Sequence, residues 1–561
     1  MAETVEAVFI SGKDGARTSV TAAKGSTILE AARSGAARNR AIALESPCNG
    51  SGICHKCEVS VAGRRVLACQ YRLEAGTEIV IQDRGADNET LKILAGGSSV
   101  EVELKPFITK EFSGGLTGVY GGRPAGGESP EGRLGLEAGD TSGESYGLAV
   151  DIGTTTLVLA LTDLNTGRVL ASESALNPQA LYAQDVLGRI RFAVREEGGL
   201  GTLHHAFLDA LLKLLDALIL KSGVPRERVY EMIYSGNTTM LHLACGIDPS
   251  SLGRYPYEPA LSGGQHLPAE DLRISPFGLI WLPPLVSAWV GADIVSGILA
   301  AGLDQRRGVT LFIDIGTNGE MVLARDGALA ASSTAAGPAF EGMNISCGMR
   351  ASRGAVESFS ISGGECGFTV IGGGEDSPEA AGICGSGLLD IAGELVKNGV
   401  IGKNGRFARP EELALREGEL ARRLRPLPDA GGKNAFFITD TVYLSQKDIR
   451  QIQLAKGAIR CGIEMLLARF GLGAAEVDTV EIAGAFGYHL RESSLLSIGL
   501  LPPEFAGKVH FAGNTSLSGA GAFLLNQDFR GRMRDLAGRV EKVELAEDPD
   551  FEKNFVRAMG F

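Results

Sequence analysis

Two short stretches that combine an aspartate, a glycine and hydroxyl side chains constrain this chain more than any other part of it. The first is Val150-Asp151-Ile152-Gly153-Thr154-Thr155-Thr156, which has apolar runs on both sides. The pattern predicts two strands joined by a tight turn that holds a carboxylate beside free backbone N–H groups and hydroxyls. Such a turn suits phosphate and Mg²⁺, because amides and hydroxyls donate to phosphate oxygens while the carboxylate holds the metal or its water shell. Alone the motif is weak, since most Asp-Gly turns only connect strands.

The same pattern returns about 160 residues later, in Leu311-Phe312-Ile313-Asp314-Ile315-Gly316-Thr317-Asn318-Gly319. From Tyr146 onward, strand-like runs alternate with helical stretches, which indicates α/β architecture. Two similar units suggest an internal duplication, with each half presenting one acidic hairpin to a shared cleft. We therefore expect a duplicated, two-lobed α/β fold with lobe one at residues 146–308 and lobe two at residues 309–561.

A third motif, Ile482-Ala483-Gly484-Ala485-Phe486-Gly487, follows in lobe two. Together the three resemble the phosphate 1, phosphate 2 and adenosine motifs of the superfamily of acetate and sugar kinases, heat-shock chaperones and actin. The resemblance implies an actin-like ATPase fold that binds ATP with Mg²⁺ between its lobes. It implies that Asp151 and Asp314 organise the metal, and that the nucleotide contacts Gly153, Thr154, Thr155, Gly316, Thr317, Asn318, Gly484 and Gly487. Glu320 either orients the attacking water or is a strand residue that faces solvent.

Four of the nine cysteines lie close together and form the pattern C-x5-C-x2-C-x11-C: Cys48, Cys54, Cys57 and Cys69. In a reducing compartment such a group indicates a metal site more than a disulfide framework. Four thiolates fit a [2Fe–2S] cluster or zinc, but zinc sites usually use two CxxC pairs, which are absent here. The spacing is one residue longer than the start of the plant-type ferredoxin pattern, which favours [2Fe–2S]. His55 is expected to be a neighbour and not a ligand, and most of the other cysteines are expected to be buried hydrophobes.

Residues 1–85 are expected to form an α+β, ferredoxin-like (β-grasp) domain, in which short strands surround the cysteines and Ser26 caps one helix that starts near Ile28. Residues 86–145 are expected to be a connector and a Gly-rich linker. From Ser113 to Ser145 large apolar residues are few, so that stretch is predicted to be flexible. A linker of this kind either lets the first domain swing or serves only as a spacer.

The net charge argues against nucleic acid as a partner, and the apolar segments argue against a membrane span. A net charge of −13 leaves no basic face for nucleic acid. The most apolar stretch, from Phe277 to Leu303, is broken by Pro283-Pro284 and carries Asp293, so no membrane span is expected. The N-terminus lacks the features of a signal peptide, and we therefore expect a cytoplasmic protein.

An electron carrier and an ATP cleft in one chain suggest that ATP drives an electron transfer that is otherwise uphill. A plant-type cluster has a potential near roughly −400 mV, and each ~59 mV of unfavourable gap lowers a one-electron equilibrium constant tenfold. An acceptor of still lower potential therefore needs coupling to another exergonic reaction.

The chain also resembles the reductive activators of corrinoid proteins, in which a [2Fe–2S] domain precedes an actin-like ATPase domain. The stretches similar to signatures of that family are Ser445 to Arg460, Gly382 to Asp390, and Ile482 to Gly487. The resemblance implies ATP-dependent, one-electron reduction of Co(II) to Co(I) on a corrinoid methyl-carrier protein, in support of anaerobic methyl transfer or O-demethylation. It also implies a low-potential electron donor and a homodimer.

Some readings stay open at this point. The Gly382–Gly387 loop approaches either the nucleotide or the corrinoid partner, and Ser386 either contacts the corrinoid or caps a helix. One alternative function is an ATP-dependent activator of a radical dehydratase, although that class carries its cysteine pair inside the ATPase domain. Another is a ferredoxin-type electron carrier with a regulatory ATP-binding domain.

Overall fold

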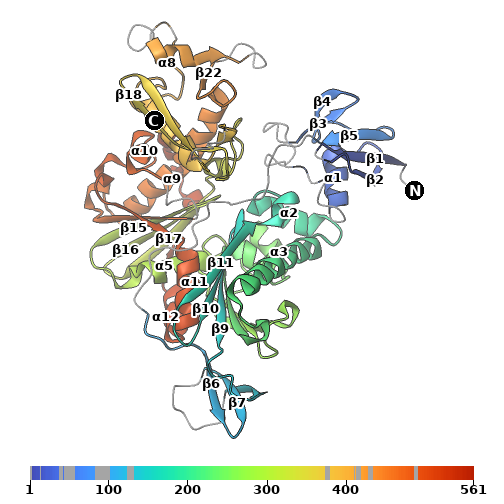
Figure 1. The fold of residues 1–561 in the computed structure, drawn as a ribbon. Coiled ribbons are helices and arrows are strands. Elements are labelled where there is room, and N and C mark those ends of the chain that lie inside the picture. Colours follow the sequence, from blue (N-terminus) through green and yellow to red (C-terminus); the bar gives the residue numbers. More distant parts are fainter. Residues whose placement is uncertain are drawn as a thin grey trace.

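The computed structural model describes residues 3–12, 14–36, 42, 44, 57–81, 102–122, 132–372, 379–409, 411, 413, 418–427, 434–484 and 490–561. Figure 1 shows an N-terminal sheet, a small sheet at the opposite end of the molecule, and a body built around two large sheets. No helix in these ranges is long and apolar enough to cross a membrane.

The N-terminal part is a five-stranded mixed sheet with one helix. Its order is β2-β1-β5-β3-β4, and β1 and β5 run parallel whereas the other neighbours are antiparallel. The apolar side of the helix, with Ile28 and Ala32, is buried in one cluster with Phe9 and Ile79. The elements are β1 (Thr4–Ser11), β2 (Arg17–Ala23), α1 (Ile28–Ala36), β3 (Glu58–Val61), β4 (Arg64–Leu67) and β5 (Thr77–Ile81).

The helix cap differs from the predicted one. The backbone N–H of Glu30 donates to the Thr27 hydroxyl over 3.2 Å, and the backbone N–H of Thr27 donates to the Glu30 carboxylate over 2.6 Å. This reciprocal pair is a capping box. Ser26 instead donates to the carbonyl of Ala23, so Thr27 and not Ser26 caps α1.

Part of the predicted linker is folded. β6 (Ile108–Ser113), β7 (Leu116–Gly121) and β8 (Arg133–Ala138) form an antiparallel sheet. Ile108 and Val119 are buried in the same core cluster as lobe one. Lys110, only 1% exposed, lies 3.0 Å from Glu137 and donates to the Tyr230 hydroxyl over 2.7 Å. The prediction of a flexible linker is therefore wrong for the described residues between 113 and 145, because a few widely spaced side chains anchor a glycine-rich segment.

The body contains two six-stranded sheets that match in the order of five strands, while the sixth strand, β13 or β26, lies at opposite edges of the two. Sheet one has the order β11-β10-β9-β12-β14-β13 and sheet two the order β25-β24-β15-β16-β17-β26. In sheet one, β9 is antiparallel to β10 and parallel to β12; in sheet two, β15 is antiparallel to β16 and parallel to β24. This shared pattern confirms the predicted duplication. Sheet one consists of β9 (Tyr146–Ile152), β10 (Thr156–Asp163), β11 (Val169–Leu176), β12 (Val229–Gly236), β13 (Gln265–Pro268) and β14 (Leu279–Leu282). Sheet two consists of β15 (Val309–Ile315), β16 (Gly319–Arg325), β17 (Ala328–Thr334), β24 (Thr479–Ala483), β25 (Val509–Gly513) and β26 (Glu541–Lys542).

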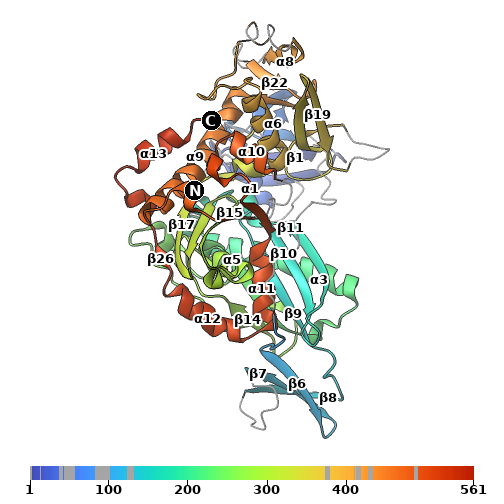
Figure 2. The ribbon, with the colours of Figure 1, turned by 90° about the vertical axis from the view of Figure 1, so that its left-hand side faces the viewer.

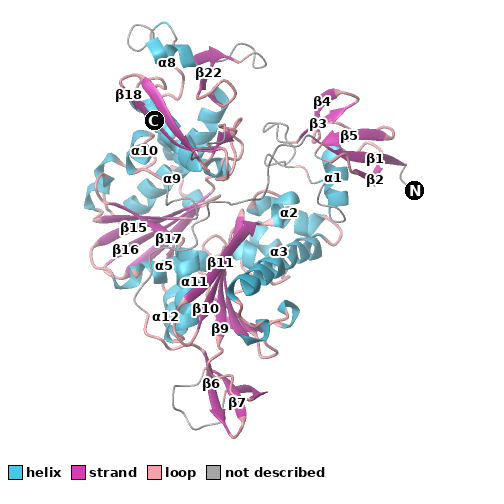
Figure 3. Cartoon of the chain, in the orientation of Figure 1, coloured by secondary structure: helices cyan, strands magenta, loops and turns pink. Residues whose placement is uncertain are grey.

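Helices cover both faces of each sheet (Figure 3). Two of them, α5 (Ala292–Ala301) and α11 (Thr515–Leu525), lie between the sheets (Figure 2) and share one core cluster with both. The outer face of sheet one is covered by α3 (Gly199–Ser222), and that of sheet two by α9 (Gln446–Arg469). Ser445 and Asp448 form a capping box at the start of α9. The remaining helices are α2 (Val186–Arg195), α4 (Thr238–Ala244), α6 (Gly385–Lys397), α8 (Gly418–Arg423), α10 (Glu492–Ser497), α12 (Asp528–Ala537) and α13 (Phe551–Ala558).

The end of the chain returns to lobe one. The ring of Phe523 in α11 lies 4.7 Å from that of Trp281 in β14, and Arg530 in α12 forms a buried ion pair with Glu231 in β12 at 2.9 Å. The boundary predicted at residue 308 therefore separates two stretches of sequence, but not two bodies in space. Two further small sheets belong to the second half: β18 (Ala355–Ser362), β19 (Glu365–Val370) and β20 (Gly382–Ile383); and β21 (Leu424–Pro426), β22 (Asn434–Phe437) and β23 (Tyr443–Ser445).

Candidate active site

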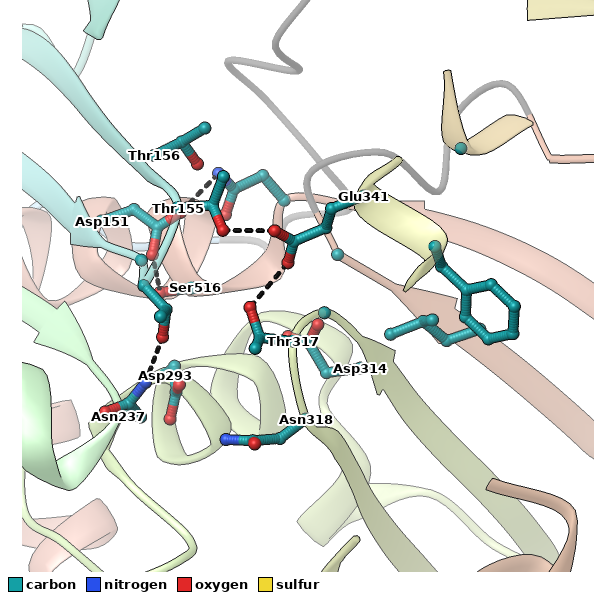
Figure 4. A pocket seen from close by; sticks show the side chains of 18 of the residues that line it. Asp151, Thr155, Thr156, Asn237, Asp293, Asp314, Thr317, Asn318, Glu341 and Ser516 are labelled. Carbon is teal, nitrogen blue, oxygen red and sulfur yellow. Dashed lines mark hydrogen bonds between the residues drawn. The ribbon is translucent and has the colours of Figure 1, made fainter. Parts of the chain in front are cut away.

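The two acidic turns meet at one cavity between the sheets, with a volume of about 180 Å³. Asp151 is the next-to-last residue of β9, directly before the turn, and Asp314 is the next-to-last residue of β15. Figure 4 shows side chains from both hairpins around this cleft. Of the residues predicted to bind nucleotide, the structure brings these to the cleft: Asp151, Gly153, Thr154, Thr155, Asp314, Gly316, Thr317, Asn318, Glu320 and Gly484. Gly487 lies outside the described residues.

Both turns leave backbone N–H groups available to a ligand. The N–H of Gly153 donates to the Thr156 carbonyl, and that of Gly316 to the Asn318 carbonyl, each over 2.9 Å. Within the described residues, the N–H groups of Thr154, Thr155, Thr317 and Asn318 donate to no backbone or side-chain acceptor. Free amides grouped in this way form an anion-binding surface.

Side chains behind the first turn hold its carbonyl groups. Asn177 donates to the carbonyl of Gly153 over 2.9 Å, and the buried Arg189 in α2 donates to that of Thr154. Asn237 also donates to the Thr154 hydroxyl over 3.2 Å. The turn is therefore held in place by side chains of lobe one.

Four carboxylates line the cleft: Asp151 and Glu320, which are buried, and Asp293 and Asp314, which are half-buried. Asp314 and Glu320 are opposite each other in the β15–β16 register, so both side chains point to the same face. Glu320 is 6% exposed, and the alternative that it faces solvent is wrong. Asn514 and Ser516, at the start of α11, each donate to Asp151 over 2.8 Å.

Burial and mutual repulsion favour the protonated forms of these acids. Loss of hydration, followed by the nearby charges of Asp293 and Asp151, raises the pKa of Asp314 to about 8. Loss of hydration likewise raises the pKa of Asp293 to about 7 and that of Glu320 well above its usual value. An apolar site that holds several acids at neutral pH is suited to a cation, because a metal ion would reverse these shifts.

The acids do not form a complete metal cage. Over the ranges that the structure describes, no group of three or more Asp, Glu, His or Cys side chains is arranged to hold a metal ion. Mg²⁺ in phosphate-transfer sites is typically bound by one or two carboxylates together with waters and substrate phosphates. The donor set of this cleft therefore fits Mg²⁺ carried in with a nucleotide.

Gly484 shows why glycine is needed at the third motif. It has φ +119°, and a Cβ placed on it would lie 2.6 Å from the Ile315 carbonyl oxygen and 3.1 Å from Oδ1 of Asp314. Any larger residue would push into the second acidic turn.

Sequence reasoning missed several residues of the cleft: Asn237, Asp293, Glu341, Asn514 and Ser516. Asp293 carried a usable signal, since it is the one acid in an apolar stretch, but that stretch was considered only as a possible membrane span. Glu341 lies in a short 3₁₀ turn, η7 (Pro338–Glu341), between two glycines. Asn514 and Ser516 gave no local signal.

The Gly382–Gly387 segment, which was expected to be a loop, consists of β20, Cys384 and the first turn of α6, and it reaches the cleft through Gly385. Cys384, and not Ser386, is the cap residue of α6, so the predicted capping role of Ser386 is wrong. The Ser386 hydroxyl instead donates to the carbonyl of Glu357 over 2.8 Å.

Two of the predicted cluster ligands are described, and they lie at the same end of one hairpin. Cys57 precedes β3 and Cys69 follows β4, and the N–H of Ala68 donates to the Cys57 carbonyl over 2.9 Å. Both thiols are buried. Cys48 and Cys54, like His55, lie outside the described residues. Of the five scattered cysteines only Cys384 and Cys461 are buried, so the expectation that most of them are buried is wrong.

Comparison with known proteins now adds to this geometry. A family model described as the C-terminal domain of RACo, the ASKHA domain, matches residues 308–561, and one described as the RACo middle region matches residues 146–306. The corrinoid activation enzyme RamQ of Eubacterium limosum is 30% identical over 91% of this chain and 93% of its own length. The chain belongs to the RACo family of reductive activators of corrinoid proteins.

Two further matches agree with membership of the RACo family. A Methanosarcina barkeri protein named [Co(II) methylated amine-specific corrinoid protein] reductase is 25% identical over 71% of this chain and 73% of its own length. The solved structure of a reductive activator for corrinoid, iron-sulfur protein has a TM-score of 0.73 and 28% identity, covering 99% of this chain and 98% of that one. The RACo family's ASKHA description agrees with the actin-like duplication seen in the two large sheets.

Proposed function

We propose that this chain is an ATP-dependent reductive activator that reduces Co(II) to Co(I) on a corrinoid protein. The observation that carries the proposal is the meeting of two acidic turns at one cleft, in a chain of the RACo family whose separate N-terminal sheet buries two cysteines. The overall change is the transfer of one electron to cobalt, coupled to hydrolysis of ATP to ADP and phosphate.

In this proposal the cleft binds Mg-ATP. The free N–H groups of Thr154, Thr155, Thr317 and Asn318 donate to phosphate oxygens, and Asp151 and Asp314 hold the metal and its waters. Glu320, on the strand beside Asp314, orients the attacking water. Gly484 and Gly487 let the backbone approach the nucleoside.

The N-terminal sheet is proposed to be a ferredoxin-like domain that carries a [2Fe–2S] cluster on Cys48, Cys54, Cys57 and Cys69. Cys57 and Cys69 fit such a group, because they are reduced, buried and placed at one end of a hairpin. When bound, the cluster would supply a low-potential one-electron carrier. The surrounding apolar residues of the sheet keep water from the thiolates, which favours a low dielectric around them.

The partner would be a corrinoid methyl-carrier protein in anaerobic methyl transfer or O-demethylation, and a separate low-potential donor would reduce the activator. A homodimer is part of the same proposal. The two alternative functions have no specific support in the structure.

The decisive experiment uses the full chain under anaerobic conditions. Reduced protein is mixed with a Co(II) corrinoid protein, with Mg-ATP, with a non-hydrolysable ATP analogue or without nucleotide, and Co(I) is followed by its absorption. We expect Co(I) only with hydrolysable ATP. Equal Co(I) in all three mixtures would instead support an electron carrier with a regulatory ATP site, and ATPase activity that no corrinoid protein stimulates would contradict the proposal.

A further inference from the structure

One carboxylate connects the two acidic turns across the cleft. Glu341, in η7, accepts a hydrogen bond from the Thr155 hydroxyl at one oxygen and from the Thr317 hydroxyl, over 2.8 Å, at the other. Thr155 belongs to the lobe-one turn and Thr317 to the lobe-two turn, and Figure 4 shows Glu341 between them. Among the residues that the structure describes, Glu341 is thus the side chain that accepts hydrogen bonds from both turns at once.

From the sequence, the hydroxyls of the acidic turns, like their amides, are expected to donate to the phosphates of ATP. A threonine hydroxyl has a single proton to donate. Thr155 and Thr317 therefore cannot donate to Glu341 and to a phosphate at the same time. A carboxylate with two acceptor oxygens between two donors also imitates the shape and charge of a phosphate edge.

We propose that Glu341 occupies a phosphate position in the nucleotide-free cleft and that the phosphates of ATP displace it. This inference rests on the proposed binding of ATP in the cleft. Glu341 is then a positioning residue that holds the two turns together until nucleotide takes over the two hydroxyls.

Electrostatics in the cleft agree with an exchange of one anion for another. Loss of hydration raises the pKa of Glu341, while the two threonine hydroxyls and the positive charges of Arg350, which lines the cavity, and of the buried Arg189 favour its ionised form. Four other acids already lie in the cleft, and an ionised Glu341 beside a triphosphate would add repulsion at low dielectric. The phosphates would gain the guanidinium group of Arg350, which lines the cavity, when the carboxylate moves away.

The turn that carries Glu341 can change direction at both of its ends. Gly337 and Gly342, which flank η7, have φ values of +77° and +76°, and glycine crosses such regions at little cost. Beyond Gly342, the N–H of Met349 donates to the Ile383 carbonyl and that of Ile383 to the Cys347 carbonyl, each over 2.8 Å. Displacement of Glu341 would therefore reach the Gly382–Gly387 segment at the start of α6.

Titration of the full-length protein with ATP tests the inference, with calorimetry in EDTA and in Mg²⁺. Glu341→Gln keeps an acceptor oxygen but removes the competing charge, and we expect it to bind ATP about tenfold more tightly in EDTA, which corresponds to roughly 1.4 kcal/mol. The matched control is Glu504→Gln, which removes one negative charge at an exposed position of lobe two and should bind as the wild type does. Unchanged or weaker binding by Glu341→Gln in EDTA would overturn the inference.

Two further arms separate the remaining outcomes. If Glu341 were a metal ligand, Glu341→Gln would leave binding in EDTA unchanged and weaken it in Mg²⁺, which also overturns the displacement. In a Thr155→Val, Thr317→Val background the effect of Glu341→Gln should vanish, because the shared donors are absent. If Glu341→Gln does not fold, Glu341→Asp, too short to span both hydroxyls, is used with the same expected direction. A wild-type protein that binds no ATP would refute the proposed function itself.

Discussion

The side-chain amide of Asn514 donates to Oδ2 of Asp151 over 2.8 Å, although the two residues are 363 positions apart in the chain. Ser516 donates to the other carboxylate oxygen over the same distance. Asn514 also caps α11 through the N–H of Leu517. The orientation of the first acidic turn therefore depends on a helix that returns from the end of the chain.

Removal of the Ser516 hydroxyl should weaken the protein and its ATPase together. In Ser516→Ala one oxygen of the buried Asp151 loses its donor, which costs about 1–3 kcal/mol of the free energy of unfolding. Ser516 is the cleaner target, because Asn514 has the second role of capping α11. Urea unfolding and steady-state ATPase assays measure both effects. Ser518→Ala, on the same helix and half-buried, should change neither, and equal behaviour of the two variants would contradict the assigned role.

The local part of the site could be predicted from the sequence, and the long-range part could not. In each acidic turn the two strands, the turn and the carboxylate lie within a few consecutive residues. The sequence alone therefore identified Asp151 and Asp314 as residues of the site. Asn514 reaches Asp151 only because α11 packs between the two sheets. That contact is a property of the tertiary fold, and no local periodicity encodes it.

In the fold, too, local features could be predicted from the sequence and long-range contacts could not. The capping box of Ser445 and Asp448 at the start of α9 lies within four consecutive residues, because a cap is a local interaction. The small sheet β6–β8 was mistaken for a linker, because its stability comes from a few contacts with lobe one, such as Lys110 with Tyr230. Composition is an average over a segment, so it does not reveal a single side chain, such as Lys110, that fixes the segment to lobe one.

Glu320→Gln should separate catalysis from nucleotide binding. If the carboxylate orients the attacking water, its loss should lower the ATPase kcat on the order of 10²-fold, while the ATP dissociation constant changes little. Glu365→Gln, an exposed position in β19, is the matched control for the change of charge. Comparable loss of ATP affinity and of kcat would show that Glu320 acts in binding instead.

Removal of one proposed cluster ligand should abolish the iron–sulfur signals without unfolding the ATPase part. In Cys69→Ser and Cys57→Ser we expect loss of the visible absorption and of the EPR signal of the reduced protein, because serine is a poor ligand for this cluster. Nucleotide binding should persist, because both residues lie in the separate N-terminal sheet. Cys366→Ser, in β19, should retain both signals. A normal [2Fe–2S] spectrum in Cys69→Ser would rule out that ligand.

The buried Lys456 of α9 should make the stability of the protein depend on pH in the alkaline range. It is 1% exposed, and its ammonium donates to the carbonyls of Gly499, over 3.4 Å, and Gly560. Loss of hydration, with the nearby charge of Arg460, lowers the pKa of Lys456 from 10.5 to about 8. Between pH 8 and 10.5 the unfolded chain therefore binds more protons at this position than the folded one, and the free energy of unfolding should rise with pH across that window. The rise should be on the order of 3 kcal/mol.

Urea unfolding across this pH window should show the rise in the wild type and in Lys508→Met. Lys508 is a half-buried lysine that also donates to two backbone carbonyls. The rise should be absent from Lys456→Met, and a parallel pH dependence in all three proteins would assign the effect to other groups.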